Sequence, residues 1–64
     1  MNQVEIKNLA EQFAKLEKTI INTDSKAEMH SAMDEIIRLS DYIMSLEDME
    51  AIDEEIQKIL LSDS

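Results

Sequence analysis

Residues 29–46 read MHSAMDEIIRLSDYIMSL, and this stretch carries the widest apolar face that a helix in the chain could have. Placed on a helix, its main apolar residues recur at alternating spacings of three and four, the period of a single helix face. These residues are Met29, Ala32, Ile36, Leu39, Ile43 and Leu46. Met33, Ile37 and Met44 widen the face to roughly half of the helix circumference. A face this wide predicts a helix over about residues 26–45 with more than one neighbour.

The preceding segment carries a narrower apolar seam with the spacings of a coiled coil. Its members are Ile6, Leu9, Phe13, Leu16 and Ile20. The seam predicts a helix over about residues 3–21, which ends at the turn-favouring residues 22–25. Ser25 and Glu28 have the spacing of a capping box at the start of the next helix, and Asp24 is a competing N-cap.

The following segment has an apolar seam of its own, made of Met49, Ile52, Ile56 and Ile59. In one unbroken helix this seam would lie roughly 140° from the apolar face of residues 29–46, so one monomeric core could not cover both. Ser45 and Asp48 supply a second capping signal, with Met44 and Met49 at the positions of a hydrophobic staple. These signals predict a turn near residues 45–47.

A third helix is therefore expected over about residues 47–61. The alternative is a helical hairpin, in which residues 26–61 form one long helix whose two apolar faces are covered by partner chains. In either case the chain is expected to be a single all-α domain over residues 1–64, because it contains no Gly and no Pro and is rich in helix formers.

The small size of the chain predicts self-association. A chain of 64 residues without Cys buries only about 60% of the surface that its unfolded form exposes, so its stability is expected to be low. Packing against other chains is the simplest way to gain stability. We therefore expect the three-helix bundle or hairpin to assemble into a larger helical bundle, with a homodimer as the first expectation.

The net charge of −9 is spread unevenly along the chain. Residues 1–26 hold four acids and four bases, whereas residues 27–64 hold eleven acids against Arg38 and Lys58. Such an excess of acids argues against direct binding to nucleic acid or to an anionic membrane. No apolar run is long enough to span a bilayer, and no basic segment followed by an apolar core begins the chain. A cytoplasmic protein with a basic protein partner is the expectation.

The residue types give little support for catalysis. One His, no Cys and no Gly-rich loop leave no nucleophile and base pair of a known kind, so we do not expect an enzyme or a cofactor. His30 and Asp34 lie one helical turn apart, but two side chains do not make a metal site, and we expect no metal.

The most charged surface is expected on the third helix. We call it the acidic stripe, and it consists of Glu47, Glu50, Asp53, Glu54, Glu55 and the neighbouring Leu61. A solvated face that keeps a small oligomer in solution would have the same composition. As a binding surface, the stripe would dock on a basic partner, with charge speeding the encounter.

Three functions follow as hypotheses. The first is a non-enzymatic regulator or inhibitor whose acidic stripe occupies a basic surface of a larger protein, for example one that handles nucleic acid. The second is a structural or chaperone subunit that packs an apolar helix of its partner into the seam of its first two helices. The third is an oligomer that binds a small molecule between its subunits.

Overall fold

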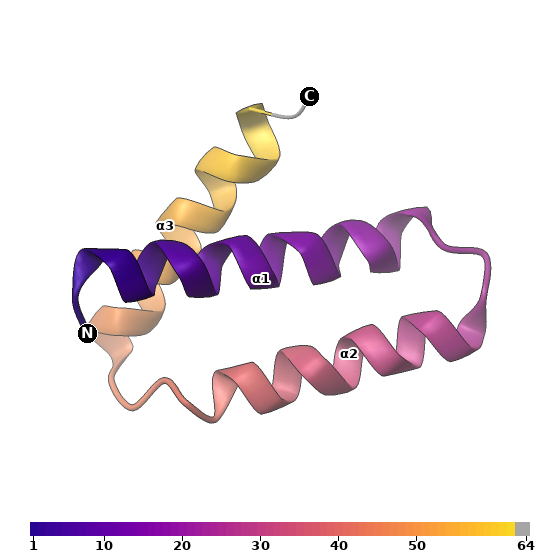
Figure 1. Cartoon of the computed structure of the whole chain (residues 1–64), viewed down its shortest axis with the longest axis horizontal. Helices are drawn as coiled ribbons and strands as arrows, with labels where there is room; N and C mark the ends of the chain where they lie inside the picture. Colours follow the sequence, from indigo (N-terminus) through magenta and orange to yellow (C-terminus); the bar gives the residue numbers. More distant parts are fainter. Residues whose placement is uncertain (63–64) are drawn as a thin grey trace.

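The computed structural model describes residues 1–62, which fold into three helices: α1 (Gln3–Asn22), α2 (Lys26–Ser40) and α3 (Leu46–Ser62). Helices α1 and α2 lie antiparallel, and α3 begins near the N-terminus and crosses α1 (Figure 1). The predicted all-α fold with three helices is confirmed. The alternative hairpin is wrong, because residues 41–45 interrupt the helix that it required over residues 26–61.

Polar side chains at the preceding residue mark the start of each helix. The Asn2 side chain accepts a hydrogen bond from the Glu5 backbone N–H at 2.9 Å, and the Ser25 hydroxyl accepts one from the Glu28 N–H at 3.3 Å. The Ser45 hydroxyl accepts one from the Asp48 N–H at 3.2 Å. These bonds satisfy donors that the first helical turn leaves without a partner. Ser25, and not Asp24, is therefore the N-cap of α2.

The second hydrogen bond of the capping box at α2 does not form, and neither does the hydrophobic staple at α3. The Glu28 carboxylate accepts a hydrogen bond from the Thr23 hydroxyl instead of one from the backbone of Ser25. Met44 is 90% exposed, so it does not pack as a staple on Met49. The sequence therefore identified the two capping serines correctly, but it did not identify the complete motifs.

Helix α2 ends at Ser40, five residues before the expected end near residue 45. The Ser40 hydroxyl donates to the Ile36 carbonyl at 2.8 Å, and the chain then tightens into bonds between residues three apart. In these bonds the Tyr42 N–H donates to the Leu39 carbonyl and the Ile43 N–H to the Ser40 carbonyl. Such a tightened turn is a common way for a helix to end without Gly or Pro. It also lets α3 turn its own apolar face toward α1.

The helix that packs between two neighbours is α1. The sequence led us to expect this position for the helix that contains the apolar face of residues 29–46. Helix α1 packs against both other helices, whereas no described Cα atom of α2 lies within 8 Å of one of α3. The buried core is formed by Ile6, Ala10 and Phe13 of α1 with Ile52 and Ile56 of α3. Only Ala32 is buried on α2. Fully buried alanines on α1 explain the difference, because small side chains let a second helix approach closely.

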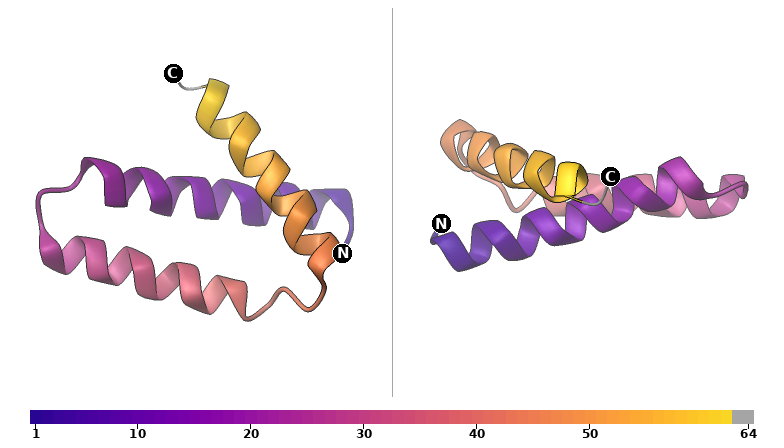
Figure 2. Two further views of the ribbon diagram at one scale, coloured as in Figure 1. Left: turned by 180° about the vertical axis from the view of Figure 1, so that it is seen from behind. Right: turned by 90° about the horizontal axis from the view of Figure 1, so that it is seen from above.

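The resulting molecule is flat and rather open. It measures 35 × 27 × 16 Å, and its radius of gyration of 12.0 Å exceeds the roughly 10.7 Å typical of a domain of this length. The views in Figure 2 show α3 lying on one side of the α1–α2 hairpin, with its C-terminal half directed away from α2. Among the described residues, no helix is long and apolar enough to cross a membrane.

Candidate functional site

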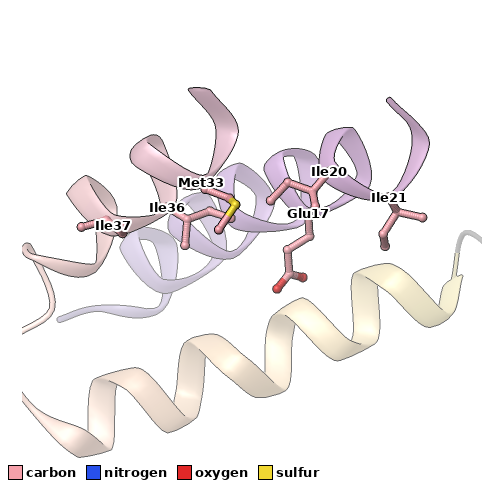
Figure 3. A pocket seen from close by; sticks show the side chains of 6 residues that line it. All are labelled: Glu17, Ile20, Ile21, Met33, Ile36 and Ile37. Atoms are coloured by element: carbon pink, nitrogen blue, oxygen red, sulfur yellow. The ribbon is translucent and has the colours of Figure 1, made fainter. Parts of the chain in front are cut away.

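An apolar groove lies between α1 and α2, near the loop that joins them. We call it the α1–α2 groove; it has a volume of about 530 Å³ and is lined by Glu17, Ile20, Ile21, Met33, Ile36 and Ile37. Figure 3 shows these side chains on the side of the hairpin where α3 lies, but no residue of α3 lines the groove. Its walls are therefore two parallel rows of aliphatic side chains with one open side.

The groove exists because α3 covers only part of the apolar surface of the hairpin. In the middle of α1, Ala10 and Ala14 are buried, at 0% and 2% exposed. Toward its C-terminal end, Ile20 is only half-buried and Ile21 is 74% exposed. Helix α3 has diverged from the hairpin there. The groove is thus the empty end of the position that a third helix would occupy in a closed bundle.

Helix α2 contributes the other wall. Met33 is 48% exposed and Ile37 is 60% exposed, although both belong to the apolar face of residues 29–46. The inner part of that face packs on α1, where Ala32 is buried and Ile36 half-buried. The face was predicted to need more than one neighbour, but within residues 1–62 no Cα atom of α3 lies within 8 Å of one of α2. The outer part of the face is therefore open to solvent.

Glu17 is the one ionisable residue that lines the groove. It is half-buried, and within residues 1–62 its carboxylate forms no hydrogen bond and no ion pair. Its side chain extends to the same side of the hairpin as that of Ile21 (Figure 3). A carboxylate at the mouth of an apolar groove is a fixed negative charge that a bound cation could approach.

Sequence reasoning did not single out Glu17, although a signal was present. Ala10, Ala14, Glu17 and Ile21 follow one another at spacings of four, three and four, so they form a single row on α1. Glu17 is the one charged member of an otherwise apolar row. That position could be interpreted only once the path of α3 was known.

The residues predicted for the core or self-association seam separate into three groups. Four are buried: Ile6, Phe13, Ile52 and Ile56. Nine are half-buried: Leu9, Leu16, Ile20, Met29, Ile36, Leu39, Ile43, Met49 and Ile59. Three are exposed: Met33, Ile37 and Leu46. Leu46 is 83% exposed because α2 ends before it, so that it begins α3 instead of continuing the apolar face of α2.

The acidic stripe lies on α3, and most of its residues are exposed. These are Glu47, Glu50, Asp53, Glu54 and Leu61. Glu50 and Glu54 each lie roughly 160° around the helix from the buried Ile52, which places them on the outward face. Glu55 differs from the rest of the stripe. Its side chain is only 17% exposed, and it forms an ion pair of 3.4 Å with Lys58.

His30 is exposed and belongs to no cluster of ligands. Within the described residues, no group of three or more His, Cys, Asp or Glu side chains could hold a metal ion. Comparisons with protein-family models, with curated proteins and with solved structures found no match to this chain. We base the functional proposals on the α1–α2 groove and on the acidic stripe.

Proposed function

We propose that this protein is a non-enzymatic binding module that receives an apolar helical segment of another protein in the α1–α2 groove. The observation that carries the proposal is the groove itself, whose walls are two helices and whose open side lies where a third helix would complete a bundle. A helix with apolar residues at i, i+3, i+4 and i+7 is the shape that such a position accepts.

The chain exposes more surface than a compact monomer of its mass typically does. The accessible surface is 4901 Å², whereas a folded monomer of 7.4 kDa typically exposes about 4,200 Å². The excess of about 700 Å² is close to the roughly 800 Å² that each partner contributes to a standard protein–protein interface. Binding in the groove would cover part of this excess.

A neutral amphipathic helix tests this function without knowledge of the natural partner. An 18-residue peptide with Leu at i, i+3, i+4 and i+7 and Gln elsewhere is titrated into ¹³C-methyl-labelled protein and followed by NMR. Shifts are expected at the methyl groups of Ile20, Ile21, Met33, Ile36 and Ile37. The methyl group of Ile52, buried in the core, is expected to shift little.

Two substitutions with the same chemistry provide the control. Ile37→Glu places a charge in the groove, whereas Leu46→Glu places the same charge on an apolar side chain that is also exposed but lies outside it. Ile37→Glu is expected to abolish peptide binding and Leu46→Glu to preserve it, with helicity unchanged in both by circular dichroism. Equal losses, or shifts confined to α3, would show that the groove is not the binding site.

The acidic stripe supports a second candidate function, docking on a basic surface of a partner. The supporting observation is that Glu47, Glu50, Asp53 and Glu54 are all exposed on the outward face of α3. A peptide of Lys and Ser, without apolar residues, tests it in an NMR titration of ¹⁵N-labelled protein. Backbone shifts on α3 that disappear in the double variant Glu50→Lys, Glu54→Lys would support docking by charge, and an absence of shifts on α3 would exclude it.

A further inference from the structure

We infer that the partner helix that fits the α1–α2 groove is basic, with a Lys or Arg beside its apolar stripe that pairs with Glu17. This inference rests on the proposed function and adds the charge of the partner to it. Two observations carry it: the position of Glu17 in the groove and the distribution of charge over the rest of the chain.

Glu17 would lose contact with water when a helix fills the groove. A half-buried carboxylate that becomes covered by an apolar or acidic segment loses hydration without a replacement, which costs free energy. A Lys or Arg at the edge of the incoming apolar stripe supplies the missing partner, because the long stems of these side chains pack on apolar surface while their charged ends reach outward. The groove therefore favours a basic segment over a neutral one.

A second copy of this chain is a poor occupant by the same reasoning. Each copy has a net charge of −9. Two of the exposed apolar residues that it could insert are accompanied by acids: Leu46 is followed by Glu47 and Asp48, and Leu61 lies on the face of Glu50 and Glu54. Insertion of either would bring like charges toward Glu17. A basic partner instead gains from the charge of the whole molecule as well as from Glu17.

The test compares two helical peptides that differ only in charge. One is the Leu/Gln peptide described above, and the other carries Lys in place of Gln at the positions that flank the Leu stripe. In 150 mM NaCl, where long-range attraction is largely screened, the wild-type protein is expected to bind the Lys peptide about tenfold more tightly. Light scattering on the complex is expected to show one protein chain per peptide.

Glu17→Gln and Glu50→Gln are matched variants, because each removes one negative charge and both retain the shape of the side chain. Glu17→Gln is expected to reduce the preference for the Lys peptide about fivefold, the effect of losing one partly desolvated ion pair. Glu50→Gln, on the outward face of α3, is expected to change the preference for the Lys peptide less than twofold. Both variants are checked for unchanged helicity.

The possible failures are distinct. If the two peptides bind equally well to the wild-type protein, the partner need not be basic, and the proposed function stands without this inference. If both variants reduce the preference equally, net charge and not Glu17 selects the partner, and the inference is wrong. If neither peptide binds, or if light scattering shows a dimer in which neither peptide shifts the methyl groups of the groove, the inference and the proposed function both fail.

Discussion

Ile52 is the largest fully buried side chain of the protein, at 0% exposed, and it joins α3 to the α1 residues of the core. Ile52→Val removes one methyl group from the buried core, and it is expected to lower the free energy of unfolding by about 1 kcal/mol. Ile37→Val makes the same change at a side chain that is 60% exposed, and its effect is expected to stay within about 0.5 kcal/mol. Urea denaturation followed by circular dichroism measures both. Similar losses in the two variants would contradict the packing described for α3.

Individual residues were predictable from the sequence to different degrees. The apolar character of Ile6, Phe13, Ile52 and Ile56 identified them as core candidates, and all four are buried. Met33 and Ile37 had the same character and equally regular spacing, but they are exposed. Periodicity gives the face of a helix on which a residue lies, whereas burial depends on whether another helix covers that face. That second condition is set by the packing of the whole chain.

At the scale of single helices, the N-caps contribute stability that substitution can measure. Ser25→Ala removes the hydroxyl that accepts the Glu28 N–H at the start of α2, and it is expected to cost about 1 kcal/mol. Ser31→Ala makes the same chemical change within α2 at an exposed position, where alanine is expected to stabilise the helix slightly because of its higher helix propensity. Opposite signs of the two changes in thermal unfolding support the cap. If Ser25→Ala caused no loss of stability, Ser25 would have no capping role.

The sequence predicted the bounds of α1 and α3 closely, but it did not predict the end of α2. Helices α1 and α3 lie within about one residue of the expected ranges, because the turn-favouring residues 22–25 mark the end of α1 and Ser45 marks the start of α3. The end of α2 at Ser40 has no such mark, since residues 41–45 contain neither Gly nor Pro. Its position reflects the need of α3 to turn its apolar face toward α1, a tertiary requirement that local propensity does not encode.

At the scale of the whole molecule, the path of α3 decides which surfaces are free. A path along the hairpin would have covered Met33 and Ile37 and closed a compact bundle, whereas the observed crossing leaves the α1–α2 groove open (Figures 1 and 3). The apolar seams predicted three packed helices, and they are equally compatible with either path of α3. The crossing of two helices depends on how their side chains interlock, here around Ala10 in the core, and spacing along the sequence does not specify it. The groove could therefore be found only in the structure, whereas the acidic stripe was evident in the sequence.

Methyl–methyl nuclear Overhauser effects in the free protein measure whether α3 leaves the α1–α2 groove open. Contacts are expected between the methyl groups of Ile6 and Ile52, which share the core. No contacts are expected between the methyl groups of Met33 or Ile37 and those of α3. Strong effects from Met33 and Ile37 to Ile59 or Leu60 would mean that α3 closes over the hairpin, and no groove would remain for a partner helix.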